Sequence, residues 1–248
     1  MVKRVENSMK LAVVTGGARG IGLGLVNSLI LAGYEVYFTY HTSDDKALEI
    51  MDTNPNKCKG FKVDSKNVEA IFQFADQVLQ YKTPDILINN VGINDDKLLI
   101  NQTFEEFKNI VDINFLSVVA FCKAFLNDMI ENRIGNIINI SSVAANKPKA
   151  GNSSYGASKL AIERFSKSLA LEVARFKIKV NCVAPGFVHT NMFDDFIASQ
   201  DKRAFYSQIP MRKILAINEV CDTVIALCNN TISTTGSVIS LGNGENIV

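Results

Sequence analysis

The sequence has few of the features that mark secreted, metal-binding or membrane proteins. Its five cysteines, at positions 58, 122, 182, 221 and 228, form no Cys-x-x-Cys pair and no spacing with histidine that is typical of zinc. The first ten residues, MVKRVENSMK, lack the apolar core of a secretory signal. The longest apolar runs fall far short of a membrane span. We therefore expect a cytoplasmic protein without a metal site, whose cysteines are core or free thiols.

The chain also lacks an excess of charge, an internal repeat and a low-complexity tract. Its 26 Lys and Arg residues nearly balance 25 Asp and Glu residues, so a net charge of +1 gives no overall attraction for nucleic acid or a membrane. No linker interrupts the pattern of the 248 residues, and we expect a single domain over residues 1–248. Because Met9 directly precedes the first expected strand, residues 1–8 are interpreted as an N-terminal extension.

Strand-like and helix-like segments alternate from residue 11 onward. This alternation predicts right-handed crossovers and an α/β fold, namely a Rossmann-type doubly wound, mostly parallel sheet with helices on both faces. The expected strands are 11–15, 35–40, 59–63, 85–89, 135–141, 178–183 and 237–241. The expected helices are 20–32, 43–52, 67–80, 104–131, 153–175 and 218–228.

A glycine-rich turn follows the first strand. The run LAVVTGGARGIGLGLVNSLILAG (11–33) places Gly16, Gly20 and Gly22 between an apolar strand and an apolar-periodic helix. Such a turn lets a pyrophosphate approach bare backbone at a helix N-terminus, where free N–H groups favour an anion. We interpret it as a dinucleotide cradle.

The stretch YGASK (155–159) contains the residues that most strongly indicate catalysis. On a helix, the Tyr155 phenol and the Lys159 ammonium lie a turn apart on one face, and a nearby cation is expected to lower the phenol's pKa. Thirteen residues upstream, Ser142 follows a buried strand, at the sheet edge where ligands bind in open α/β sheets. Tyr155 is then the acid that protonates a ketone oxygen, and Ser142 donates a hydrogen bond to that oxygen. Ser141 competes for this role, but is expected to point to the opposite side of the strand end.

Together these motifs resemble the short-chain dehydrogenase/reductase family over nearly the whole chain. Within it, IINISSV, FSKSLALEVA and VNCVAPGFVHTNM look most like 3-oxoacyl-[acyl-carrier-protein] reductases. The resemblance rests on TGGARGIG (15–22), Asp64 after GFKVD, NNVG (89–92), Asn114 in VDINF, Ser142, Tyr155 with Lys159, and APGFVHT (184–190). It implies that Lys159 holds the nicotinamide ribose and that Asn114 holds a water linking Lys159 to solvent. The alternative for Asn114 is a side chain that bonds its own helix backbone.

The end of the second strand predicts NADPH as the cofactor. An NAD site expects a carboxylate there, whereas this chain has none until Asp44 and Asp45. Arg19 in the glycine loop, with His41 and Thr42 after the strand, suits a 2′-phosphate, although Arg19 and His41 are also ordinary surface residues. By resemblance, further cofactor contacts come from the glycine loop, the adenine side and the nicotinamide side, namely Ile21, Asp64, Asn90, Gly92, Pro185, Gly186, Val188 and Thr190.

The section 187–213 departs from the alternating pattern and holds several Phe and Met residues. One interpretation is a helical hairpin that packs on the domain. The other, which we favour, is a mobile lid over cofactor and substrate, rooted at Pro185 and Gly186, whose apolar side chains suit an acyl chain.

The resemblance implies reduction of a 3-oxoacyl chain on an acyl carrier protein, in fatty acid or polyketide-type biosynthesis. Arg133 stands where that subfamily places a carrier-binding arginine, while the second such position is Phe176, flanked by Arg175 and Lys177. Arg133 is equally explained as a cation that complements a helix C-terminus. The alternatives are a reductase of a free ketone, quinone or sugar, or a cofactor-sensing binding protein. A homotetramer or homodimer is expected, although the tail Leu241–Gly244 departs from the family's Asn-Gly-Gly.

Overall fold

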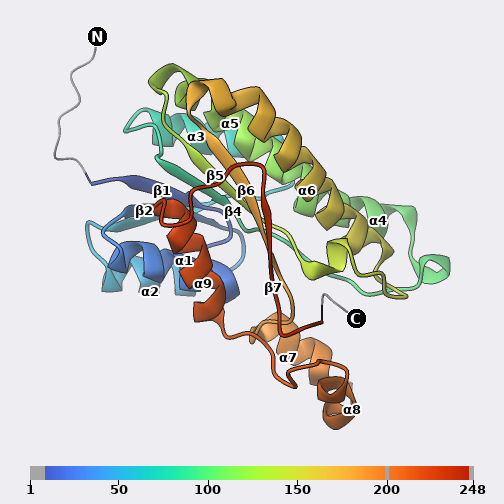
Figure 1. Ribbon diagram of the computed structural model, residues 1–248. Helices are drawn as coiled ribbons and strands as arrows, with labels where there is room; N and C mark the ends of the chain where they lie inside the picture. Colours follow the sequence, from blue (N-terminus) through green and yellow to red (C-terminus); the bar gives the residue numbers. More distant parts are fainter. Residues whose placement is uncertain (1–8, 199–200, 246–248) are drawn as a thin grey trace.

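A seven-stranded parallel sheet forms the centre of the computed structural model, which describes residues 9–198 and 201–245 (Figure 1). The strand order is β3-β2-β1-β4-β5-β6-β7. Chain order reverses between β1 and β4, so their carboxyl ends flank the crevice in which such sheets bind ligands. The strands are β1 (Leu11–Val14), β2 (Glu35–Tyr40), β3 (Cys58–Lys62), β4 (Ile86–Asn89), β5 (Asn136–Ile140), β6 (Lys179–Pro185) and β7 (Val238–Leu241). The predicted doubly wound fold is confirmed.

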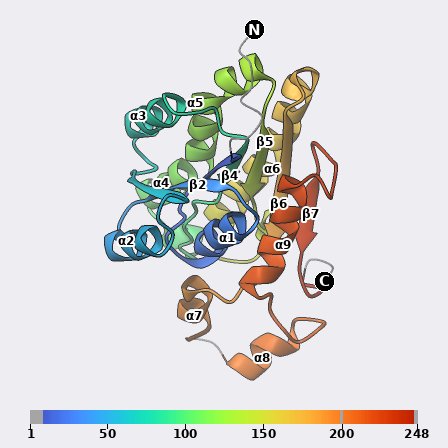
Figure 2. The ribbon, with the colours of Figure 1, turned by 90° about the vertical axis from the view of Figure 1, so that its left-hand side faces the viewer.

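Helices cover both faces of the sheet, as Figure 2 shows from the side. Alternate strand residues point to opposite faces, so Ala12 and Val14 pack into one core while Leu11 and Val13 pack into the other. The first core is covered by α1 (Gly20–Leu31), α2 (Asp44–Thr53) and α9 (Ile217–Cys228). The second is covered by α3 (Val68–Leu79), α5 (Ser117–Asn132) and α6 (Ser153–Val173).

The helix predicted over 104–131 is divided by a π-helical turn. It consists of α4 (Phe104–Val111), the π turn Asp112–Leu116 and α5. The extra residue of a π turn shifts the side chains that follow it around the helix axis, and such turns are frequent at functional sites. The turn here contains the fully buried Asn114.

The stretch Phe104–Asn132 is, by length and composition, long and apolar enough to cross a membrane, with a mean hydropathy of 1.6 in its most apolar window. The prediction that apolar runs fall far short of a span was therefore wrong for this stretch. Helices that are buried in a protein core pass the same test, and Phe121, Phe125 and Met129 of α5 lie fully inside the second core. Burial in the second core thus accounts for the apolar side chains of this stretch.

The section 187–213 contains two short helices, α7 (Asn191–Ala198) and α8 (Lys202–Ser207), which project below the sheet in Figure 1. Its aromatic residues pack mainly against one another: the Phe187 and Phe205 rings lie 4.8 Å apart, and Phe193 and Phe205 are buried. A small third core results, consisting of Phe193, Ile197, Phe205, Ile209 and Ile214 with Phe187, Phe196 and Tyr206 against it. Met192 and Met211 remain exposed.

Candidate active site

The glycine loop has the shape that its sequence predicts. Gly16 and Gly20 adopt positive φ values of 67° and 54°, which side-chain-bearing residues rarely adopt. A Cβ on Gly22 would lie 2.1 Å from the Gly16 carbonyl oxygen, so only glycine fits there. Thr15 Oγ1 accepts a hydrogen bond from the Asn90 amide (2.9 Å) and thereby ties the loop to the end of β4. The bare backbone at the start of α1 fits a dinucleotide pyrophosphate.

The end of β2 presents the residues expected around a 2′-phosphate. Arg19 is the exposed N-cap residue of α1, and His41 and Thr42 are exposed directly after β2. The first carboxylate after them, Asp44, lies in the first turn of α2 and forms a 2.9 Å ion pair with Lys62 of β3. This carboxylate is therefore already paired with a lysine of the neighbouring strand.

The loop after β6 lies next to the glycine loop. A Cβ on Gly20 would lie 3.6 Å from Thr190 Cγ2, although 170 positions of sequence separate the two residues. Pro185 ends β6, the Gly186 amide donates to the Leu241 carbonyl (2.7 Å), and Val188 is buried. Of the other predicted contacts, Asp64 is half-buried just after β3, and Gly92 and Ile21 are half-buried at the same sheet edge.

Tyr155 and Ser142 are brought together as predicted. Tyr155 lies in the first turn of α6, and Ser142 follows β5. Burial raises the pKa of the Tyr155 phenol, and its hydrogen bond with the Ser142 hydroxyl partly offsets that rise. The Lys159 ammonium donates to the Ile140 carbonyl at 2.9 Å and stands 5.7 Å from the centre of the Tyr155 ring. The expected lowering of the tyrosine pKa by Lys159 is thus wrong for this arrangement, because burial dominates.

Burial also disfavours the charged form of Lys159. Only 3% of the residue is exposed, and burial lowers its pKa to about 8. Desolvation disfavours the charged form, and the single carbonyl contact replaces only part of the lost hydration. A phosphate- and hydroxyl-bearing ligand that reaches this ammonium would restore hydrogen bonds to it.

Ser141 and Ser142 have separate environments. Ser141 is buried, and its hydroxyl donates to Glu163 Oε1 at 2.9 Å and to the Lys159 carbonyl at 3.2 Å. Ser142 is half-buried beside Tyr155, and its Oγ accepts from the Ala144 amide at 3.1 Å. The geometry supports Ser142 as the residue that faces substrate.

Asn114 does not bond its own helix. Its Oδ1 accepts from the Ile93 amide (2.8 Å), and its Nδ2 donates to the Ile93 carbonyl (2.9 Å) and to Ser158 Oγ (3.1 Å). A Cβ on Gly92 would lie 3.6 Å from Asn114 Oδ1 and 3.2 Å from Lys159 Nζ, so both side chains converge on that glycine. The alternative drawn from sequence, a bond to the helix backbone, is therefore wrong.

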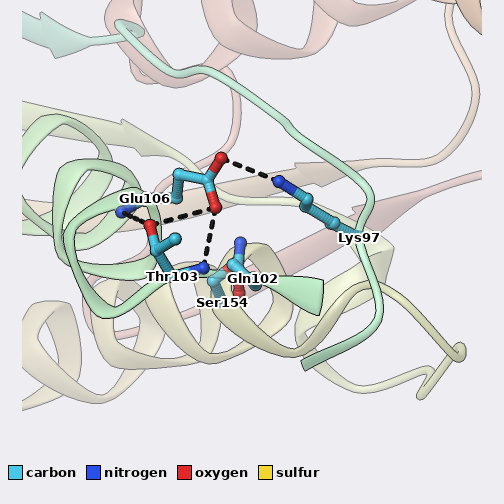
Figure 3. Close-up of polar contacts among 5 residues, drawn as sticks. All are labelled: Lys97, Gln102, Thr103, Glu106 and Ser154. Carbon is cyan, nitrogen blue, oxygen red and sulfur yellow. Dashed lines mark hydrogen bonds and ion pairs between the residues drawn. The ribbon is translucent and has the colours of Figure 1, made fainter. Parts of the chain in front are cut away.

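The segment before α4 is held against the start of α6 by a hydrogen bond between Gln102 and Ser154 (Figure 3). Thr103 and Glu106 form a capping box at the start of α4, and Lys97 pairs with Glu106 at 2.8 Å. Gln102 Nε2 donates to Ser154 Oγ at 3.1 Å, next to Tyr155 in the chain. Capping-box spacing is visible in the sequence, but the link between Gln102 and Ser154 is not, because 52 positions separate them.

The unusual tail supports the loop after β6. The Glu245 side chain is buried against Gly186, where a Cβ would collide with Glu245 Oε1, and that oxygen accepts from the Phe187 amide at 3.2 Å. Lys147, in the loop after Ser142, donates to the Glu245 carbonyl at 2.8 Å. The residues that follow this departure from Asn-Gly-Gly thus place a buried carboxylate against the loop after β6.

Comparison with known proteins agrees with this geometry. The model of the family described as short chain dehydrogenase matches residues 10–201. The chain belongs to the short-chain dehydrogenase family. Members of this family use a nicotinamide cofactor, and the glycine loop described above fits one.

Named relatives in the short-chain dehydrogenase family match the chain almost end to end. The 3-oxoacyl-[acyl-carrier-protein] reductase FabG of Buchnera aphidicola subsp. Acyrthosiphon pisum is 37% identical over 235 residues, 94% of this chain and 96% of that protein. The protein of that name from Escherichia coli K12 is 34% identical over 96% of this chain and 98% of its own length. Among solved structures, "ElxO with NADP Bound" has a TM-score of 0.90 and 26% identity, covering 97% of this chain and 100% of its own.

Proposed function

We propose that this chain is an NADPH-dependent 3-oxoacyl-[acyl-carrier-protein] reductase of fatty acid or polyketide-type biosynthesis. It would reduce a 3-oxoacyl thioester, carried by an acyl carrier protein, to the 3-hydroxyacyl form. The observation that carries this proposal is the nearly full-length similarity, at 33–37% identity, to relatives of that name. The presence of Asn114, Ser142, Tyr155 and Lys159 at one sheet edge supports it.

The chemistry follows from the positions of these side chains. When bound, the nicotinamide cofactor would supply the hydride for the carbon of the ketone. Tyr155 donates its phenolic proton to the ketone oxygen, and a high pKa keeps that proton in place at neutral pH. Ser142, which contacts the same phenol in the ligand-free protein, would direct its single hydroxyl proton to the ketone oxygen as negative charge develops there. Lys159 holds the ribose, and a water beside Asn114 returns the proton to Tyr155.

NADPH rather than NADH is supported by charge at the adenine end. Arg19, His41 and Thr42 are available to a 2′-phosphate, whereas Asp44 is held by Lys62. The remaining cofactor contacts that we propose are those expected from the sequence: Gly16, Gly20, Ile21, Gly22, Asp64, Asn90, Gly92, Pro185, Gly186, Val188 and Thr190.

The substrate side is proposed to be closed by the section 187–213 acting as a lid. Because its aromatic residues form their own core, the lid moves as a packed unit and not as a loose chain. Lys149 lies 4.6 Å from the Phe196 ring centre and pairs with Asp96 at 2.8 Å, which connects α7 to two loops at the site.

An acidic carrier is proposed to dock near Arg133. Arg133 caps α5 in a left-handed conformation, and its guanidinium donates to the Arg175 carbonyl at 3.1 Å, so both basic residues lie at one end of α6. Tyr155 lies at the other end, and the 21 residues of α6 span about 30 Å. A carrier docked there is therefore expected to deliver its acyl chain to the active site of a neighbouring subunit and not to Tyr155 of the same chain. A homotetramer or homodimer is supported by Leu160 and Leu171 of α6, which are 46% and 83% exposed.

The decisive experiment measures NADPH oxidation with carrier-bound 3-oxoacyl chains, acetoacetyl thioesters of small thiols, simple ketones, quinones and sugars in parallel. Preference for the carrier-bound chain supports the proposal. Activity only on free ketones, quinones or sugars places the protein among reductases of those compounds. Cofactor binding without turnover on any of them places it among cofactor-sensing proteins.

Arg133→Glu tests the docking site. The variant is expected to lose much more activity on carrier-bound chains than on the same chain attached to a small thiol, because only the carrier needs the basic surface. The contrast should shrink as salt rises. Equal losses on both substrates would mean that Arg133 serves the fold through its bond to Arg175.

A further inference from the structure

Glu163 is a buried carboxylate that the proposed proton transfer does not use. It lies on α6, two turns after Tyr155 and one turn after Lys159, and only 4% of it is exposed. Burying a carboxylate is costly unless its oxygens are hydrogen-bonded. Both oxygens are: Oε1 accepts from Ser141 Oγ at 2.9 Å, and Oε2 accepts from Asn146 Nδ2 at 3.0 Å.

These two hydrogen bonds connect Glu163 to the first and last residues of the segment 141–146, which contains Ser142. Ser141 precedes Ser142 at the end of β5, and Asn146 follows the short helical turn Val143–Ala145. Glu163 therefore fixes residues 141–146 to the same helix that carries Tyr155. One helix thus carries Tyr155 and also, through Glu163, contacts residues on both sides of Ser142.

We propose that Glu163 is a positioning residue that holds Ser142 in hydrogen-bonding register with Tyr155. The proposal rests on the proposed function, since it assumes that Ser142 and Tyr155 act together on a carbonyl. Glu163 would act through Ser141 and Asn146, whose side chains donate hydrogen bonds to it. A carboxylate suits the task because it accepts two hydrogen bonds in opposite directions from one rigid side chain.

The test compares Glu163→Ala, which removes both bonds, with Glu163→Gln, which keeps the shape and retains both bonds if the Asn146 amide turns over. Glu172→Ala is the matched control, because Glu172 is exposed on the same helix. We expect Glu163→Ala to lower kcat by at least about tenfold, since small displacements of reacting groups are costly. Glu163→Gln should recover most of the rate, and Glu172→Ala should match the unaltered protein. All variants should melt cooperatively by circular dichroism and bind NADPH normally.

A double substitution separates positioning from general damage. In a Ser142→Ala background, Glu163→Ala should cause almost no further loss of kcat, because its only route to the reaction has been removed. A loss of the same size in both backgrounds would overturn the proposal, as would wild-type kcat in Glu163→Ala.

A second readout does not depend on substrate. The titration of Tyr155, taken as the tyrosinate absorbance that disappears in Tyr155→Phe, should move to higher pH in Glu163→Ala, because the hydrogen bond from Ser142 that lowers the Tyr155 pKa is weakened. Ser142→Ala should cause the same movement, and the double variant no more. An unmoved titration in Glu163→Ala would overturn the proposal. If the unaltered protein reduces no 3-oxoacyl thioester, the proposed function fails, whereas this titration still decides the role of Glu163.

Discussion

Replacing Lys159 by methionine is expected to stabilise the cofactor-free protein while destroying its activity. Methionine has a similar length and no charge, so it fills the space without the cost of burying an ammonium. Burial lowers the Lys159 pKa from 10.5 to about 8, which corresponds to roughly 3 kcal/mol of folding free energy. Loss of the hydrogen bond to the Ile140 carbonyl lowers the free energy of unfolding by about 1 kcal/mol. The net gain of about 2 kcal/mol should raise the melting temperature by roughly 4 to 8 °C.

The pH dependence of this gain identifies its cause. Below about pH 8 Lys159 is protonated in both the folded and the unfolded protein, so the folded protein carries the full penalty. Between about pH 8 and 10.5 the unfolded chain binds a proton that the folded chain has released, so the stability contributed by this group rises with pH. The advantage of Lys159→Met should therefore fade over that range.

The sequence contains no tryptophan, so unfolding is best followed by circular dichroism at neutral and alkaline pH. The activity loss, measured as NADPH oxidation, should accompany the gain in stability. A variant that melts below the unaltered protein at neutral pH, or a difference that is the same at both pH values, would refute the argument.

Three further substitutions test the site. Tyr155→Phe should lower turnover by at least about 100-fold and leave NADPH binding, followed by its fluorescence, nearly intact; a near wild-type rate would remove Tyr155 from the catalytic role. Gly22→Ala should cost about 1 to 3 kcal/mol of stability and weaken cofactor binding, because the new Cβ meets the Gly16 carbonyl at 2.1 Å; an unchanged melting curve would contradict this. Thr42→Asp should move the ratio of kcat/KM from NADPH toward NADH by repelling the 2′-phosphate, and equal efficiency of the unaltered protein with both cofactors would show that the end of β2 does not select.

The order of strands and helices was predictable because each element carries its own periodic signal. β1, β4 and β5 are short buried runs, and the helices between them are amphipathic or apolar with turn residues at their ends. The carboxyl ends of parallel strands meet at one edge, so the meeting of the glycine loop, Ser142 and Tyr155 followed from the topology.

Contacts between distant positions were not predictable. Nothing local marks the π turn at Asn114, since the hydrophobic period of 104–131 continues through it. The Asn114 side chain in this turn forms hydrogen bonds with Ile93, which is distant in sequence. Glu163 looks in sequence like a solvated polar residue of a helix. Its partners, Ser141 and Asn146, lie about twenty positions upstream across a loop. The Tyr155 pKa depends on how deeply the phenol is buried, which spacing does not reveal.

The separate core of α7 and α8 bears on how the protein acquires new substrates. Because the aromatic side chains of α7 and α8 pack on one another and belong to neither of the two cores beside the sheet, substitutions in these two helices should leave both cores intact. The residues at the carboxyl edge of the sheet and those of α7 and α8 can therefore change independently of one another. Exchange of α7 and α8 between relatives, with Val188 and Thr190 retained, is therefore a route to altered chain-length preference that leaves the reaction unchanged.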